Sequence, residues 1–131
     1  MKQVSKNTNQ VNESHHNVAI IGTGFAGLCM AIRLKQQGEE DFVLYEKAET
    51  LGGTWRDNTY PGCGCDVPSN LYSLSFEQNP NWSTKFAGQN EILQYLHRLT
   101  EKYRVEQNIK FHTEITAMVW DPPRKRWLLT T

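Results

Sequence analysis

The stretch VAIIGTGFAG at residues 18–27 decides the fold. Its first four residues form a short, continuous apolar run, which predicts a strand buried on both faces of a parallel sheet. Three glycines follow in the spacing of a turn that leads from a strand into a helix. Apolar residues at helical spacing then predict a helix over residues 28–37, ended by Gly38. Residues 41–46 predict a second strand, so the sequence opens with a βαβ unit.

The glycine spacing has a chemical reason. Gly22 permits the sharp turn, Gly24 lets a pyrophosphate approach the backbone, and Gly27 lets the helix pack closely on the strand. The helix N-terminus then offers unpaired N–H groups and a partial positive charge to phosphates. Glu46 follows about 20 residues later, at the end of the second strand, where its carboxylate can accept hydrogen bonds from ribose hydroxyls. Because that carboxylate would repel a 2′-phosphate, we predict a dinucleotide site that does not hold NADP.

The rest of the chain is consistent with one α/β domain. Residues 47–88 are rich in Gly, Pro, Asn, Ser and aromatic residues and predict a long loop region, which in compact domains usually carries function. An apolar stripe predicts a second helix over residues 90–103. Alternating patterns predict strands at residues 109–112, 115–120 and 126–131, with a turn before the last one. We therefore predict a Rossmann-like βαβ unit followed by a long loop region, a second helix and a β-hairpin.

Length and composition exclude several classes of protein. The 131 residues suit one compact domain, and 38% hydrophobic residues suffice for a core. The 14 Lys and Arg residues balance 14 Asp and Glu residues without a basic stripe, which argues against a nucleic-acid partner. No apolar run approaches the roughly 20 residues of a transmembrane segment, and no signal-peptide core is present, so we expect a cytoplasmic location. Residues 1–16 are polar and predict a disordered tail, which leaves residues 17–131 as the domain.

The three cysteines indicate neither a disulfide framework nor a metal site. An odd, small number of cysteines argues against a set of structural bridges. Cys63 and Cys65 are separated by one residue, and no Cys or His pair lies nearby at zinc spacing. We therefore expect Cys63 and Cys65 to be two reduced thiols in a tight loop, and we expect no metal.

The segments after Glu46 favour FAD over NAD. They read LGGTW at residues 51–55, NTYPG at residues 58–62 and CDVPS at residues 65–69. An NAD dehydrogenase would ordinarily continue into another βα unit here, whereas a Gly-Gly pair suggests a second backbone approach to an extended dinucleotide. An NAD-binding Rossmann domain of a dehydrogenase stays as an alternative.

These segments, together with LYSLSF at residues 71–76 and FAGQNEILQYL at residues 86–96, resemble the flavin-containing monooxygenase superfamily. The chain is most like the N-terminal FAD-binding part of Baeyer–Villiger monooxygenases of the hydroxyacetophenone and cyclohexanone type, from about Asn17 onward. The resemblance implies FAD as the cofactor, with NADPH and O₂ used by a full-length parent. The parent reaction would be Baeyer–Villiger oxidation of a ketone, or oxygenation of a nitrogen or sulfur atom in a small-molecule substrate.

The resemblance also implies roles for individual residues. The FAD pyrophosphate would be held by Gly22, Gly24, Phe25, Ala26 and Gly27, with Gly53 nearby. Glu46 would hold the ribose, Lys47 would lie at the adenosine end, and the backbone of Ile115 would meet the adenine. The path to the flavin would be lined by Thr54, Trp55 and Asp57, and the flavin or its ribityl chain would be contacted by Asp66 and Tyr72. Asp66 is the predicted catalytic residue, because such an Asp positions an arginine that stabilises the peroxyflavin. Without the resemblance, we would interpret Trp55 and Tyr72 as core aromatics under a long loop, and Asp66 as the cap of a turn.

The 131 residues hold only part of the family pattern. They contain no second glycine-rich βαβ motif for NADPH, and the arginine partner of Asp66 would lie beyond Thr131. We therefore expect an incomplete FAD/NAD(P)-binding domain that has no monooxygenase activity by itself. A catalytically silent FAD-binding remnant is the alternative.

Overall fold

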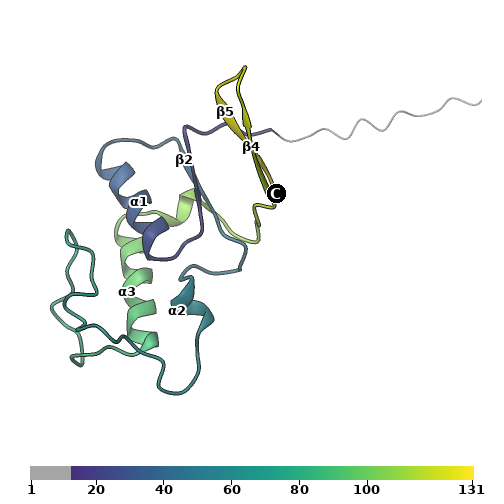
Figure 1. The fold of residues 1–131 in the computed structure, drawn as a ribbon. Helices are drawn as coiled ribbons and strands as arrows, with labels where there is room; N and C mark the ends of the chain where they lie inside the picture. Colours follow the sequence, from purple (N-terminus) through teal and green to yellow (C-terminus); the bar gives the residue numbers. More distant parts are fainter. Residues whose placement is uncertain (1–12) are drawn as a thin grey trace, which may run out of the picture.

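The computed structural model describes residues 13–131 (Figure 1). The elements in chain order are β1 (Val18–Ile21), α1 (Phe25–Gln36), β2 (Phe42–Tyr45), α2 (Thr54–Asp57), α3 (Gln89–Lys102), a 3₁₀ turn (Glu106–Asn108), β3 (Ile109–Lys110), β4 (Ala117–Asp121) and β5 (Arg126–Thr130). Most of the predicted tail lies outside the described residues, and residues 13–16 are exposed. The mixed α/β, Rossmann-like architecture predicted from the sequence is confirmed.

The sheet that positions the glycine turn has three parallel strands in the order β1-β2-β3. Val18 pairs with Phe42 at the start of β1, and Leu44 of β2 pairs with Ile109 of β3. All four residues of β2 are buried, as expected for a central strand of a parallel sheet. The segment at residues 109–112, predicted only as a strand, therefore supplies the third parallel strand, and α3 lies in the crossover that leads to it.

The prediction that β1 is buried on both faces is wrong. Its residues alternate between half-buried and exposed, and Ile21 is 52% exposed. Within the described residues β1 is an edge strand, and only one of its faces is covered, by α1. Successive side chains of a strand point to opposite faces, so Val18 and Ile20 join the core while Ala19 and Ile21 do not.

Both long helices form where the apolar pattern predicts them, with shifted ends. α1 starts at Phe25, three residues earlier than predicted, because the glycine motif itself provides its first turn. It buries Leu28, Ala31 and Ile32 completely, and Gly38 follows it with a φ of +81°. α3 buries Ile92, Tyr95, Leu96, Leu99 and Thr100 and lies beside α1 and α2 (Figure 1).

The long loop region has little regular structure, as predicted, but side chains fasten it to the core. α2 is its one short helix. The Ser69 hydroxyl accepts a hydrogen bond from the N–H of Ala87 at 2.7 Å, which fixes the middle of the loop to its C-terminal end. The Tyr95 hydroxyl donates to the carbonyl of Glu77 and accepts from the N–H of Leu74. The loop is therefore held in one arrangement beside the glycine motif.

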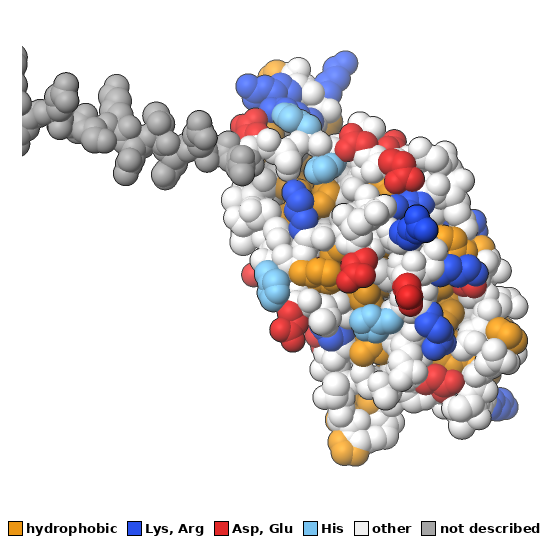
Figure 2. Space-filling model, turned by 180° about the vertical axis from the view of Figure 1, so that it is seen from behind, with side chains coloured by type: hydrophobic (Ala, Val, Ile, Leu, Met, Phe, Trp, Pro, Cys, Tyr) orange, Lys and Arg blue, Asp and Glu red, His pale blue; other side chains and the backbone are white. Residues whose placement is uncertain are grey.

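The β4–β5 hairpin stands away from the helices (Figure 1). Trp120 pairs with Trp127 across it, and their rings meet edge to face at 5.5 Å. Both are largely exposed, at 45% and 61%, so the hairpin contributes little to the main core. On the face seen in Figure 2, acidic and basic side chains are interspersed. None of the helices that the structure describes is long and apolar enough to cross a membrane.

Candidate dinucleotide-binding site

Two glycine turns lie against each other at the carboxyl ends of β1 and β2. The first contains Gly22 and Gly24, and the second contains Gly52 and Gly53. The N–H of Gly52 donates to the carbonyl of Thr23 at 3.1 Å. A Cβ atom added to Gly53 would lie 3.1 Å from the Cα of Gly24, so the two backbones are in close contact. Gly53 also has a φ of +52°, which favours glycine.

The three glycines of the first turn differ in how strongly the fold requires them. A Cβ at Gly27 would lie 2.1 Å from the carbonyl oxygen of Gly22, so packing of the helix on the turn demands glycine there. Gly22 has a φ of +90°, a left-handed conformation. Gly24 has an ordinary extended backbone, and a Cβ there would meet only the Cα of Gly53 at 3.9 Å. Nothing within residues 13–131 therefore requires glycine at position 24.

The N-terminus of α1 is open. Gly24 is its N-cap, no side chain caps it, and its first turn contains no acidic residue. Among residues 13–131, none accepts a hydrogen bond from the N–H groups of Phe25, Ala26 and Gly27. Such N–H groups carry the positive end of the helix dipole and need an acceptor, which a phosphate can supply.

Glu46 joins the end of β2 to the first turn. Its Oε2 atom accepts hydrogen bonds from the N–H and the hydroxyl of Thr23 at 3.0 and 2.6 Å, and its Oε1 atom accepts one from the N–H of Ala48. Arg56 lies 3.1 Å from Oε1. Burial opposes ionisation of this carboxyl, but the bonds from Thr23 and Ala48 and the charge of Arg56 outweigh it and lower its pKa. Glu46 is thus an ionised carboxylate that is only 4% exposed.

Sequence reasoning missed two residues here, Thr23 and Arg56. Thr23 occupies a variable position of the glycine motif, and its complete burial gives no signal in the sequence. Arg56 directly follows the Gly-Gly-Thr-Trp segment, but its pairing with Glu46 spans an irregular loop, which spacing does not reveal. A charged residue so close to a glycine pair is the only hint that the sequence offers.

Three aromatic residues gather beside the glycine turns. The Trp55 indole donates a hydrogen bond to the Tyr72 hydroxyl at 3.1 Å, and the two rings meet edge to face. The ring of Phe25, at the start of α1, lies 5.0 Å from that of Tyr72. Trp55 is buried, whereas Tyr72 and Phe25 are partly exposed. The structure therefore brings together three of the residues predicted to line the cofactor.

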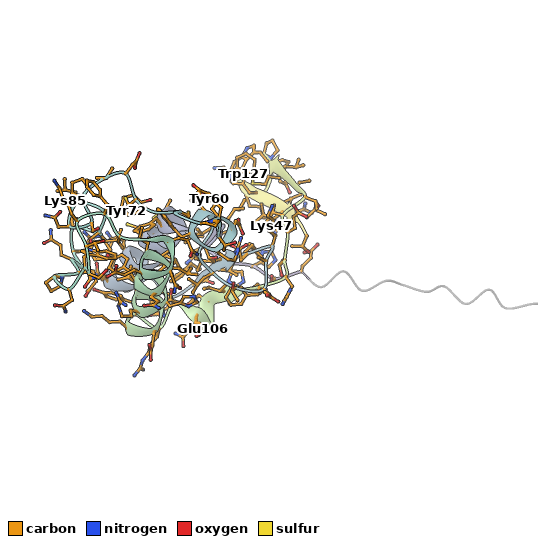
Figure 3. The ribbon with its side chains drawn as sticks, turned by 90° about the horizontal axis from the view of Figure 1, so that it is seen from below. Lys47, Tyr60, Tyr72, Lys85, Glu106 and Trp127 are labelled. Atoms are coloured by element: carbon orange, nitrogen blue, oxygen red, sulfur yellow. The ribbon has the colours of Figure 1, made fainter. Side chains whose placement is uncertain are left out.

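The other predicted site residues lie around this centre. Lys47, Thr54, Asp57 and Asp66 are exposed, and Ile115 is half-buried. Asp57 binds the guanidinium of Arg56, while no described residue forms a hydrogen bond or ion pair with the carboxylate of Asp66. Figure 3 shows Lys47 and Tyr72 on opposite sides of Tyr60.

Cys29 lies in α1, whereas Cys63 and Cys65 lie in the loop that meets the start of α3. The N–H of Cys65 donates to Ala87, and the carbonyl of Cys63 accepts from Gln89. All three thiols are free. Within residues 13–131, no three His, Cys, Asp or Glu side chains come together in a group that could hold a metal ion.

The model of the family described as "NAD(P)-binding Rossmann-like domain" matches residues 20–89, more than half of the chain. The chain therefore belongs to this family of Rossmann-like dinucleotide-binding domains. Within that class, the comparisons confirm its likeness to flavin monooxygenases and to the N-terminal part of Baeyer–Villiger monooxygenases.

Two curated relatives carry this likeness. A Baeyer–Villiger monooxygenase of Pseudomonas aeruginosa is 55% identical over 115 residues, which cover 88% of this chain and 22% of the relative. A FAD-binding monooxygenase of Aspergillus terreus is 44% identical over 115 residues, which cover 86% of this chain and 20% of the relative. The chain thus spans less than a quarter of the length of these relatives.

Two solved structures share the fold. An oxidised steroid monooxygenase bound to NADP superimposes with a TM-score of 0.83 at 38% identity, over 88% of this chain and 23% of the other. An open cyclohexanone monooxygenase gives a TM-score of 0.84 at 33% identity, over 89% of this chain and 24% of the other. The names and bound groups of these proteins agree with the prediction of FAD, with NADPH as the second nucleotide of the family.

Proposed function

We propose that this chain binds FAD as the N-terminal portion of an NADPH- and O₂-dependent flavoprotein monooxygenase. The observation that carries the proposal is the open N-terminus of α1, whose first turn contains no acid and whose leading N–H groups have no acceptor among the described residues. A second glycine turn lies directly beside it. A pyrophosphate is the group that such a site fits.

The residues of the site match the parts of FAD. The N–H groups of Phe25, Ala26 and Gly27 would bind the pyrophosphate, because they are the unpaired donors. Gly24 would keep a side chain away from it, since the fold itself leaves room for a Cβ at that position. This explains a glycine that neither backbone conformation nor packing demands.

Glu46 is proposed to bind the adenosine ribose of FAD. Its carboxylate would accept hydrogen bonds from the adenosine ribose hydroxyls, and its negative charge would disfavour a 2′-phosphate. Four donors of the chain already surround it, so a ribose hydroxyl would share or replace one of them. The exposed Lys47 follows it on the side proposed for adenosine.

The flavin end of FAD is proposed to contact the aromatic group of Trp55, Tyr72 and Phe25. Figure 3 shows Lys47 and Tyr72 on opposite sides of Tyr60, and this separation supports placing the adenosine end of FAD near Lys47 and the flavin end near Tyr72. The exposed Asp66 is proposed to serve the catalytic step, and Thr54 and Asp57 to line the path between the ends. Ile115 is proposed to meet the adenine through its backbone.

FAD would supply the redox chemistry, and the residues of this chain would bind and orient it. For the whole protein we propose Baeyer–Villiger oxidation of a small-molecule ketone, or oxygenation of a nitrogen or sulfur atom. Support comes from the relatives named Baeyer–Villiger monooxygenases and from the cyclohexanone and steroid monooxygenases that share the fold.

Binding of NAD is the second candidate, because the matching family is described by NAD(P). Titration of the full chain with FAD and with NAD, each followed by fluorescence, separates the two functions. We expect FAD to bind more tightly, and tighter binding of NAD would reverse the order of the two candidates.

The variant Gly24→Val tests the site itself. We expect it to abolish FAD binding, because its side chain would occupy the space of the pyrophosphate. A thermal melt shows whether the variant is folded. A folded Gly24→Val protein with normal flavin content would contradict the proposed site.

A further inference from the structure

Arg56 lies at the site, but the dinucleotide motif does not explain why an arginine is needed there. Its side chain is only 15% exposed although it carries a full charge. Its Nη1 atom donates to the carbonyl of Thr50 at 2.6 Å and lies 3.1 Å from Oε1 of Glu46. Its Nε and Nη2 atoms bind the carboxylate of Asp57 at 2.8 and 3.1 Å. A guanidinium bound in this way is fixed in both position and plane.

These contacts connect the residues before the second glycine turn with the residue after it. Thr50 lies before Gly52 and Gly53, and Arg56 lies after them. The guanidinium reaches back to the carbonyl of Thr50, while the N–H of Arg56 donates to the carbonyl of Gly53 at 3.0 Å. The turn between them is therefore held from both sides by one residue.

The same guanidinium fastens the second glycine turn to the first. It pairs with Oε1 of Glu46, whose Oε2 atom accepts two hydrogen bonds from Thr23. This connection runs beside the direct hydrogen bond between Gly52 and Thr23. Without Arg56, the buried carboxylate would lose its only ion-pair partner among the described residues, and the second turn would keep one direct bond to the first.

We propose that Arg56 is a positioning residue that acts through Glu46 to hold the second glycine turn against the first and so preorganises the site for the FAD pyrophosphate. The inference rests on the proposed function. The ligand does not have to order a site that is already ordered. Loss of this preorganisation therefore weakens binding of the ligand. The effect belongs to the nucleotide half of FAD, and ADP is therefore a suitable second probe.

The test compares three variants of the full chain by fluorescence titration with FAD and by calorimetry with ADP. We expect Arg56→Met, which keeps much of the packing, to weaken both ligands by about tenfold, as for one charge-assisted contact. Arg56→Lys restores a charge beside Glu46 and should bind within about threefold of wild type. Arg33→Met, in the last turn of α1, removes an arginine away from the glycine turns and should change neither affinity.

The Glu46→Gln background shows whether Arg56 acts through Glu46. In that background Arg56→Met should weaken the affinity for FAD and ADP by less than about threefold, because the charge of its partner is already gone. An equal cost in both backgrounds, or no rescue by lysine, would overturn the inference. If Arg56→Met does not fold, Arg56→Gln replaces it with the same expectations. Wild-type protein without FAD affinity would overturn the proposed function, whereas a tight wild type matched by Arg56→Met would overturn only the role of Arg56.

Discussion

The two long helices of this protein begin alike, yet they differ in what meets their first turns. Both have a glycine N-cap with extended backbone angles and no side-chain cap, Gly24 for α1 and Gly88 for α3. At α3 the first N–H, from Gln89, donates to the carbonyl of Cys63, and Glu91 places a carboxylate in the first turn. At α1 no described residue plays either part.

This difference separates structure from function. A helix start whose first N–H has an acceptor in the chain and whose first turn contains an acid is part of the scaffold, as at α3. The start of α1 keeps its donors free, lies between two glycine turns and is next to an ionised carboxylate. The comparison teaches that a glycine N-cap alone does not mark the site, because both helices have one.

The largest expected effect comes from Gly27→Ala, which removes the structural basis of the α1 start. The added Cβ would lie 2.1 Å from the carbonyl oxygen of Gly22. We expect a loss of about 3 kcal/mol or more in the free energy of unfolding, since backbone atoms have to move. Urea denaturation followed by circular dichroism measures it, with Gly24→Ala as the control that should stay close to wild type. Equal stability of the two variants would contradict the close packing of α1 on the turn.

The next effect concerns the carboxylate beside the α1 start. Glu46→Ala should weaken FAD affinity on the order of ten- to a hundredfold, since charge-assisted hydrogen bonds to the ribose contribute about 1.5–3 kcal/mol each. It should also lower stability, because the N–H groups of Thr23 and Ala48 lose their acceptor. Flavin-fluorescence titration measures the affinity, and an unchanged value would count against Glu46 as the ribose ligand.

Glu91→Ala is the matched change at α3 and sharpens the comparison. Glu91 accepts hydrogen bonds from the N–H and the hydroxyl of Ser83, both at 2.8 Å. Its removal should lower stability by about 1 kcal/mol, a typical net value for such bonds. FAD affinity should not change. If both glutamate variants weaken FAD equally, the two helix starts do not differ in function.

The smallest effect is a pH dependence at Glu46. Its pKa is lowered in the folded protein because hydrogen bonds and Arg56 outweigh burial. The stability it contributes is therefore present above the unfolded-state pKa, about 4.3, and is lost as the pH falls through the lower folded-state pKa. Wild type should lose stability more steeply than Glu46→Gln in acid-unfolding experiments. Parallel curves would show that the carboxylate is not stabilised in its ionised form.

The sequence predicts the βαβ unit because period and glycine spacing are local properties. The run at residues 18–21 and the apolar stripe of α3 identify elements that form where expected. It does not predict the exposed face of β1, since the pattern VAII is the same whether one face or both are covered. Nor does it reveal that Ile109 and Lys110 join the sheet beside β2, which depends on contacts between distant segments.

The site divides in the same way. Gly22, Gly24, Gly27 and Glu46 follow from the motif, and the structure places them together. The sequence does not reveal the role of Arg56, because its partners Thr50 and Glu46 come close to its side chain only when the loop folds. Motif spacing therefore identifies the groups that would touch the ligand, whereas the groups that hold them in place emerge from three-dimensional packing.

The most direct test of the α1 start as the FAD site compares Gly24→Ala with Gly88→Ala. Both glycines are N-caps with negative φ, and a Cβ would meet its nearest atom at 3.9 Å in each case. The free energies of unfolding of the two variants should therefore lie within about 1 kcal/mol of the wild-type value, because both sites accept a methyl group without strain. FAD titration should show at least a tenfold loss for Gly24→Ala and no change for Gly88→Ala. Equal FAD affinities for the two variants would contradict the account.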